Sequence, residues 1–536
     1  MMMGRGIHEI EFILLFLLLF IVVFATLARK LQTPYPIVLV IAGLLLSFVP
    51  GIPNVSLNPD VIFLVVLPPL LYSAAWVTSW REFKFNLVSI CMLAFGLVGF
   101  TVAGVAATSK WVFAGFDWRL GFVLGAVVAT TDAIAATAIA KRIGLPRRIV
   151  DILEGESLVN DATGLLALEF GVAIVVSGQT PTVGAGLLRL AYLTIAGLAL
   201  GLIVGTVVEW IHRHIDDGPI EITLTLVVPY VAYLTAEAIH ASGVLAVVAC
   251  GLYLSRKSSQ FFSPNVRMQA WAVWDALTFV LNGLVFVRIG LQMPFVLAGI
   301  HDYSFVQLVK YGALFSAIVI VLRLMWMYPG AYFSNVIRRR LLHQDVRMPS
   351  GRQIFVVGWT GMRGVVALAA AISLPEMLAD GSPFPQRNLI VFLTFSVILV
   401  TLVLQGLTLP PLIRALGLGE SAGHLAEEKE ARRAMIEAAL DHLLRLRAKD
   451  RPEFAHVYDD IEQHYTERLA TLTGESGDKG SGNPAHYARH QELKRELVRI
   501  ERRTAVRLRN EGRINDEVLR RVEHELDLSE ERLSLM

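Results

Sequence analysis

Long apolar stretches recur along most of this chain, and thirteen of them approach the length of about 20 residues that a helix needs to cross a bilayer. They run over residues 8–28, 35–50, 60–77, 86–108, 119–141, 148–177, 184–211, 219–237, 241–255, 268–292, 305–333, 353–375 and 388–415. The chain is 54% hydrophobic and 18% charged, whereas roughly a quarter of a soluble protein is charged. The sequence predicts an all-α membrane protein with about 13 transmembrane helices. The eighth and ninth stretches are short and only His240 separates them, so twelve or fourteen spans remain open.

The basic residues in the short connections predict the orientation, because cytoplasmic loops carry an excess of Lys and Arg. With the N-terminus outside, the inside connections hold Arg29, Lys30, Arg81, Lys84, Lys141, Arg142, Arg147, Arg148, Arg213, Arg256, Lys257, Arg267, Arg338, Arg339, Arg340, Arg347 and Arg352. The outside segments hold Arg5, Lys110, Arg119 and Arg387. We therefore expect an outside N-terminus, a cytoplasmic C-terminus and a location in the cell (inner) membrane. The first stretch is longer than a signal-peptide core of about 7–15 residues, so we expect it to be retained.

The composition changes near residue 419. Residues 1–418 form the predicted membrane domain, and residues 419–536 are charged, with helical patterning such as Leu493, Leu497 and Ile500. A Gly- and Ser-rich segment at 473–486 is typical of a linker and divides this tail. The tail is interpreted either as a solvated helical appendage or as a dimerising or regulatory domain.

Several function classes find no support in the sequence. Cys91 and Cys250 lie far apart in apolar stretches, which favours neither a disulfide framework nor a cysteine metal site. Neither a Walker A motif nor a dinucleotide fingerprint is present, so we expect no built-in ATPase or redox motor and no enzyme. We expect no cofactor and no nucleic-acid partner.

Four charged residues fall near the middle of predicted spans. They are Asp132, Glu156, Asp161 and Arg363. A charge at the bilayer centre costs about 3 kcal/mol even on the lenient insertion scale, so such residues face a protein interior or a water-filled cavity and mark ion pathways. A purely structural ion pair between Glu156 and Arg363 is the alternative.

Helical spacing divides the polar groups of the sixth stretch between two faces. Ser157 and Asp161 lie four residues apart on one face, and Glu156 and Asn160 share the adjacent face. A hydroxyl and a carboxylate are hard oxygen ligands, which suit a cation such as sodium better than a soft metal. The second carboxylate and the amide are suited to binding an arginine.

The fifth and twelfth stretches are predicted to be interrupted helices. TTDAIAATA, beginning at Thr130, has adjacent threonines that compete for backbone hydrogen bonds, and GWTGMRG, ending at Gly364, holds three glycines. Interrupted helices in corresponding positions favour two inverted six-helix repeats, spans 1–6 and 8–13, with the site where they cross. Ordinary packing of small residues is the alternative.

Taken together, TTDAIAATAI, GESLVNDATGLLALEF, GMRGVVALA and LPPLLYSAA resemble the signatures of the monovalent cation:proton antiporter family. The Asn-Asp pair in the sixth stretch resembles the electroneutral sodium/proton exchanger branch. The resemblance implies that Asp161 alternately holds sodium and a proton, and that Ser157 and the backbone around Thr131 complete the Na⁺ shell. It also implies that Asp132 lies at the crossing and that Asn160, Glu156 and Arg363 form a supporting network. Members of the family usually form homodimers, so the resemblance implies a homodimer in which a core domain of each chain moves against a dimerisation domain.

The sequence departs from the family pattern in two places. Ser73 stands where the family commonly has an acidic residue, although we still place it among the ion-binding residues. Asn282 aligns with a glutamate of the animal-type exchangers, and Arg288 is an additional charge in the same span.

We therefore expect a secondary transporter that exchanges Na⁺ (or Li⁺) for H⁺, electroneutrally and 1:1, by alternating access. Its partners would be membrane lipid and a second copy of the chain. The alternatives are a K⁺/H⁺ antiporter, an ion channel or solute symporter, and a membrane sensor or enzyme with the tail as effector.

Overall fold

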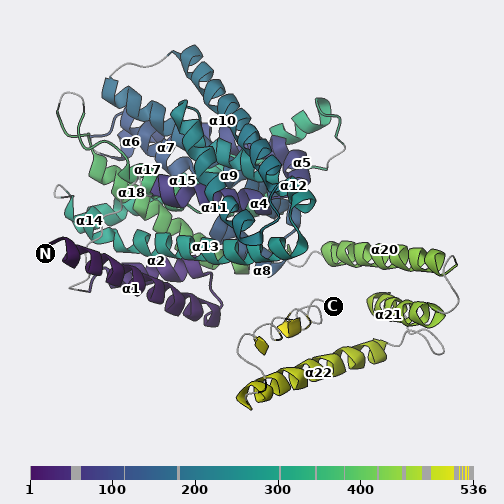
Figure 1. The fold of residues 1–536 in the computed structure, drawn as a ribbon. Helices are drawn as coiled ribbons and strands as arrows, with labels where there is room; N and C mark the ends of the chain where they lie inside the picture. The colour runs from purple at the N-terminus through teal and green to yellow at the C-terminus, as the bar shows by residue number, and fades with distance from the viewer. Residues whose placement is uncertain are drawn as a thin grey trace. The chain divides into compact units, whose positions relative to one another are not determined.

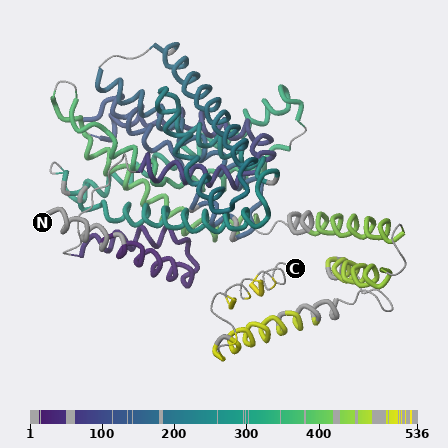
Figure 2. Tube along the Cα trace, in the orientation of Figure 1, coloured from purple at the N-terminus to yellow at the C-terminus, as the bar shows by residue number. Residues whose placement is uncertain are grey.

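The computed structural model describes residues 2–49, 62–113, 115–177, 182–300, 303–344, 347–378, 381–418, 422–448, 454–473, 484–511 and a few residues between 513 and 529 (Figure 2). The chain separates into two compact units, Met1–Glu420 and Ser421–Met536 (Figure 1). The boundary lies within two residues of the composition change.

The described part of the first unit is helical apart from one isolated bridge between Met377 and Pro383. Its α-helices are α1 (Met2–Lys30), α2 (Tyr35–Leu46), α4 (Leu67–Val77), α5 (Trp80–Cys91), α6 (Val98–Val112), α7 (Trp118–Ala129), α8 (Ala133–Ile143), α9 (Arg147–Ser177), α10 (Val183–His212), α11 (Gly218–Ala238), α12 (Gly243–Phe261), α13 (Pro264–Leu291), α14 (Met293–Ala298), α15 (Phe305–Arg340), α16 (Gly351–Trp359), α17 (Val365–Ile372), α18 (Arg387–Val400) and α19 (Gly406–Ala415). There are also three short π-helical segments. Ile62–Val66 precedes α4, Met92–Leu97 joins α5 to α6, and Thr401–Gln405 joins α18 to α19.

Within the described residues, seven helices are long and apolar enough to cross a membrane, and three further apolar helices are shorter. The chain is therefore a multi-pass membrane protein. Two of the predicted stretches, 119–141 and 353–375, are each divided into two helices, α7 with α8 and α16 with α17. The total of thirteen spans and the inverted repeats stay predictions.

Small residues allow the long helices to approach closely. A Cβ on Gly197 or Gly201 of α10 would meet the backbone carbonyl oxygen of Ser242 or Ala246 at the start of α12. Such small-residue contacts are typical of helices packed in a membrane, where close van der Waals packing replaces the hydrophobic effect. Gly43 of α2 faces α13 in the same way.

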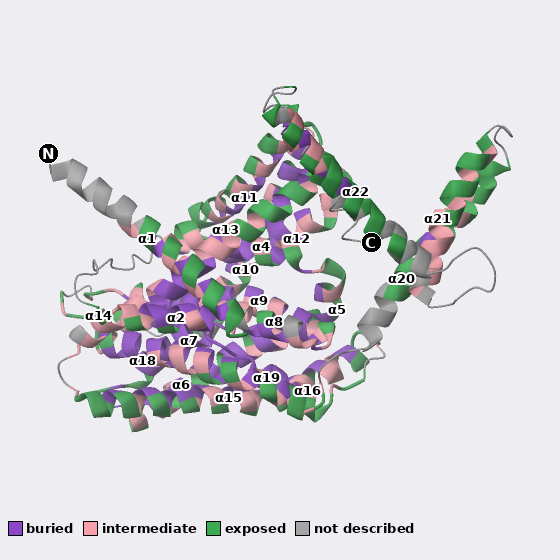
Figure 3. Cartoon of the chain, turned by 90° about the horizontal axis from the view of Figure 1, so that it is seen from below, coloured by how far each residue is buried: buried purple, intermediate pink, exposed green. Residues whose placement is uncertain are grey.

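Burial differs strongly between the spans. In the continuous helix Arg387–Ala415, 78% of the most apolar window is buried, against 28% for Gly184–His212 of α10 (Figure 3). Exposed apolar side chains such as Leu188, Ile195 and Ile203 cover α10. The helix Arg387–Ala415 therefore lies inside the bundle, and α10 presents an apolar surface suited to lipid or another chain.

The second unit contains α20 (Ala422–Arg447), α21 (Ala455–Thr473) and α22 (Pro484–Asn510). Arg447 at the end of α20 binds Asp459 and Glu462 of α21 at 2.7 and 2.9 Å, which joins these two helices. Most of the predicted linker, residues 474–483, lies outside the described residues. The patterned residues Leu493, Leu497 and Ile500 lie in α22 and are exposed.

Candidate ion-binding site at two interrupted helices

The two interrupted helices meet at their breaks. Residues 130–132 separate α7 from α8, and residues 360–364 separate α16 from α17. The backbone N–H of Asp132 donates a hydrogen bond to the carbonyl oxygen of Met362 at 2.9 Å. The breaks predicted from the threonines and the glycines are therefore present, and they lie against each other.

Glycine is required at this crossing because no space remains for a side chain. A Cβ on Gly364 would meet the side chain of Asp132, and a Cβ on Gly361 would meet the side chain of Arg323. The two glycines thus let Asp132, from the first break, and Arg323, from α15, approach the backbone of the second break.

The carboxyl-terminal ends of the two broken helices each bind an arginine. Arg363 donates from Nε to the carbonyl oxygen of Val128 in α7 at 2.8 Å. Arg323, from α15, donates to the carbonyl oxygens of Gly358 and Val357 in α16 at 3.0 and 3.2 Å. These carbonyls have no partner within their own helix, and the negative end of the helix dipole favours a cation there.

Asp132 lies at the amino-terminal end of α8. Its Oδ1 accepts a hydrogen bond from the N–H of Ile134 at 2.8 Å, and its side chain also lies against Gly364, the residue before α17. A carboxylate is favourable beside the positive end of a helix. The other oxygen, Oδ2, is buried and has no hydrogen-bond partner in the described part of the chain.

Glu156 is bound by Arg323 and not by Arg363. The two guanidinium nitrogens Nη1 and Nη2 of Arg323 donate to Oε1 and Oε2 of Glu156 at 2.6 and 2.9 Å, and both side chains are buried. The predicted pairing of Glu156 with Arg363 is therefore wrong. Arg363 instead donates from Nε to Val128 and from Nη1 to the carbonyl oxygen of Gly361, so backbone groups occupy it.

The predicted polar faces of α9 both contact residues 130–133. The amide of Asn160 donates to the hydroxyl of Thr131, which in turn donates to Oε1 of Glu156 at 3.2 Å. On the neighbouring face, the hydroxyl of Ser157 donates to the carbonyl oxygen of Thr131 at 2.8 Å and accepts from the N–H of Ala133 at 3.3 Å. Asn160 thus binds the break itself and not an arginine.

A cavity of about 550 Å³ reaches this crossing. Its lining includes Asp161, Ser157, Thr131, Asp132 and Ser73, so the structure brings all the predicted ion-binding residues to one space. Among the described residues, no hydrogen bond or ion pair engages the carboxylate of Asp161. Asp132 is close enough to repel it electrostatically. A carboxylate in this setting can hold a cation or a proton.

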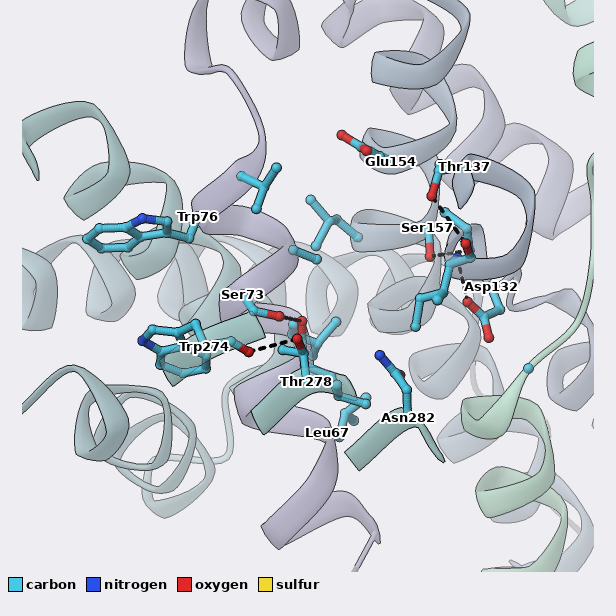
Figure 4. Close-up of a pocket in the computed structure, with 18 of the residues that line it drawn as sticks. Leu67, Ser73, Trp76, Asp132, Thr137, Glu154, Ser157, Trp274, Thr278 and Asn282 are labelled. Atoms are coloured by element: carbon cyan, nitrogen blue, oxygen red, sulfur yellow. Dashed lines mark hydrogen bonds between the residues drawn. The ribbon is translucent and has the colours of Figure 1, made fainter. Parts of the chain in front are cut away.

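Figure 4 shows two walls of the cavity. Asp132 and Ser157 lie on one side, and Ser73 lies across from them on α4, its hydroxyl donating to the carbonyl oxygen of Leu70 at 2.9 Å. Asn282 of α13 lies between the two groups (Figure 4). Asn282 therefore presents an amide to the cavity.

Arg323 is the site residue that the sequence analysis missed. It stands alone among apolar residues in the middle of the stretch 305–333, in the run IVLRLMW. An ionisable residue at membrane depth is a functional candidate by default, so this signal was available. What the sequence could not supply was its partner, which lies 167 residues away along the chain.

Comparisons with known proteins identify the family of this chain. A family model described as sodium/hydrogen exchanger, transmembrane, matches residues 15–415. An uncharacterized Na⁺/H⁺ exchanger of Mycobacterium tuberculosis is 33% identical over 521 residues, covering 96% of this chain and 94% of that protein. The Na⁺/H⁺ antiporter ApNhaP of Aphanothece halophytica is 34% identical over 415 residues, 77% of this chain and 75% of the relative.

These matches define a membrane transporter that exchanges a cation for a proton. The chain belongs to the sodium/hydrogen exchanger family. The fold resembles that of the sodium proton antiporter MjNhaP1 from Methanocaldococcus jannaschii, with a TM-score of 0.57 at 19% identity over 78% of this chain and all of the other.

Proposed function

We propose that this protein exchanges Na⁺ or Li⁺ for H⁺, electroneutrally and 1:1, with ion and proton competing for Asp161. Ser157 and the backbone carbonyl of Thr131 would supply further oxygens, with water filling the remaining positions. Asp132 and Ser73 would shape the electrostatics of the cavity. Glu156, Asn160 and Arg363, together with Arg323, would hold the interrupted helices in place.

The charge balance around the crossing carries this proposal. Two arginines, Arg323 and Arg363, face three carboxylates, Glu156, Asp132 and Asp161. When all five groups are ionised, one negative charge is left over at the end of a cavity. Buried charge is costly unless it is compensated, so one monovalent cation or one proton gives the favourable state. Either occupant leaves the same net charge, which is the condition for electroneutral exchange.

The ligand set favours an alkali-metal ion. The polar groups of the crossing that line the cavity offer oxygen ligands from the carboxylates of Asp132 and Asp161, from hydroxyl groups and from the backbone. Hard oxygen ligands suit hard cations, and a single excess carboxylate suits a monovalent ion better than a divalent one.

The predicted orientation assigns the cavity to the cytoplasmic side. Its lining includes Glu154 near the start of α9 and Arg267 near the start of α13, two helix ends that the distribution of basic residues places inside. We therefore propose that the structure represents an inward-open state. The N-terminus would lie outside and the C-terminus in the cytoplasm, with the protein in the cell (inner) membrane.

Inverted repeats and a homodimer are proposed from the places of the helices in the chain and from their exposed faces. The two interrupted helices stand fifth in each predicted group of six spans, which supports inverted repeats linked by α10. The exposed apolar faces of α1 and α10 support contact with lipid and a homodimer. The tail is proposed to dimerise or regulate the transporter.

Proteoliposomes with an internal pH dye test the proposed exchange. An imposed Na⁺ gradient should move protons, and the initial rate should be unchanged when valinomycin and K⁺ set different membrane voltages. A rate that follows the voltage would contradict the 1:1 stoichiometry. No proton movement with Na⁺, Li⁺ or K⁺ would return the question to a channel, a symporter or a sensor.

A K⁺/H⁺ antiporter is the second candidate. A protein of Bacillus pumilus named sodium, potassium, lithium and rubidium/H⁺ antiporter is 34% identical over 390 residues, 70% of this chain and 57% of its own length. The same oxygen ligands accommodate either ion, so the proteoliposome assay should compare K⁺ directly with Na⁺.

A further inference from the structure

A second cavity, of about 200 Å³, lies at the end of the bundle where α9 and α16 begin and α15 ends. It is separate from the ion-binding cavity, and the two share no lining residue. Three arginines line it: Arg148 of α9, Arg338 of α15 and Arg347 of the connection to α16. In the part of the chain that the structure describes, no carboxylate lines this cavity.

Two of these arginines have buried nitrogens without a partner. Nη2 of Arg338 and Nε of Arg148 are both buried and donate to no protein acceptor within the described residues. Arg338 itself is only 2% exposed. A buried charged donor without an acceptor costs free energy, and native structures rarely leave one without an unobserved ligand or water.

The position of Arg338 is fixed although its hydrogen bonding is incomplete. Its Nε donates to Oε1 of Gln344 at 2.9 Å, and its guanidinium carbon lies 4.5 Å from the ring centre of Phe85. The guanidinium of Arg148 lies 5.9 Å from the same ring. The positively charged guanidinium groups of Arg148 and Arg338 therefore both lie near Phe85 and repel each other. Arg148 is also attracted by the carboxylate of Glu82. An anion between the arginines would relieve this repulsion.

Two helix ends add to the positive potential. Pro146 and Ile149 at the start of α9 and Gln353 in the first turn of α16 also line the cavity. Helix amino-terminal ends favour anions. Apolar side chains also line the cavity, among them Met92, Ile152, Met327 and Ile354.

We propose that this cavity binds a phosphate group through Arg148, Arg338 and Arg347. Planar guanidinium groups with several free donors match the oxygens of a phosphate, which makes arginine the preferred residue for this recognition. The group belongs either to the headgroup of an anionic phospholipid, whose acyl chain would contact the apolar lining, or to free phosphate. A ligand here would connect α5, α9, α15 and α16.

Thermal unfolding of the purified full-length protein in detergent tests the site. Dioctanoyl phosphatidylglycerol and Tris phosphate are titrated separately, in sodium-free buffer at constant ionic strength, against dioctanoyl phosphatidylcholine and Tris chloride. We expect a saturable rise in melting temperature. A rise with phosphatidylglycerol alone assigns the group to lipid, and an equal rise with phosphate assigns it to the free anion.

Variants locate the effect. Arg338→Gln and Arg347→Gln should raise the half-maximal ligand concentration at least about tenfold, since a charge-assisted bond is lost. Arg340→Gln, which removes an exposed charge of the same helix end outside the cavity, should titrate as the wild type does. Because Arg338→Gln removes a buried side chain, the exposed Arg347 provides a variant that tests the site even if the first fails to fold. No rise in the wild type, an equal rise with chloride, or equal weakening by Arg340→Gln would overturn the proposal.

Discussion

Arg323 binds both carboxylate oxygens of Glu156, at 2.6 and 2.9 Å, and with the same guanidinium group binds the last carbonyls of α16. Three helices, α9, α15 and α16, therefore meet at one buried ion pair. Removing one partner of such a pair leaves the other charge buried and uncompensated.

Glu156→Gln should lower the free energy of unfolding by about 3–5 kcal/mol, because Arg323 would keep its charge without its anion. Thermal unfolding in detergent measures this. Glu169→Gln is the matched control on the same helix: Glu169 is exposed and pairs with Arg189 at 3.4 Å, so its loss should cost less than about 1 kcal/mol. Similar losses in both variants would contradict the importance of the ion pair.

Asp161→Asn should abolish Na⁺-dependent proton movement in proteoliposomes, since an amide cannot exchange a proton for a cation. Its melting temperature should not fall, because the change removes an uncompensated charge without breaking a hydrogen bond among the described residues. Glu169→Gln should retain transport. Substantial residual exchange in Asp161→Asn would end the assignment of Asp161 as the shared carboxylate.

Lower pH should weaken the apparent affinity for Na⁺. A proton on Asp161 excludes the cation, so the KM for Na⁺ should rise as pH falls, by about tenfold per unit once the carboxyl group is mostly protonated. Initial rates of dye response over a range of Na⁺ concentrations at several pH values provide the test. A KM that stays constant while the maximal rate changes would indicate separate sites for ion and proton.

Gly364→Ala should impair both folding and transport, at a cost of about 1–3 kcal/mol, because the added Cβ would meet the side chain of Asp132. Gly351→Ala at the start of α16 is the control, since its Cβ would enter open space. Melting temperature and exchange rate should distinguish the two. Equal tolerance of both substitutions would show that the crossing is looser than the structure indicates.

Local features of the sequence predicted much of the site. The threonines at 130 and 131 and the glycines around Arg363 predicted the two breaks, and the four-residue spacing of Ser157 and Asp161 predicted a shared face at the cavity. These features depend on one helix at a time.

The partner of Glu156 could not be predicted in this way. Arg323 and Arg363 are both basic residues near the middle of apolar stretches, and the choice between them depends on how α15 and α16 pack against α9. The cavity has the same origin, because α4 and α13 supply Ser73 and Asn282 from distant parts of the chain. Tertiary packing, which no local pattern encodes, decides both.

The double role of Arg323 limits which parts of the protein can change position. If α9 separated from α16, the buried guanidinium of Arg323 would lose either the carboxylate of Glu156 or the carbonyl oxygens of α16. Such a loss would cost several kcal/mol. The crossing, its two arginines and Asp161 would thus travel as one rigid body. Movement would then occur at the cavity, between the crossing and the opposite wall on α4 and α13. That wall presents mainly apolar side chains, such as Leu67, Leu71 and Trp274, which can slide without breaking an ion pair.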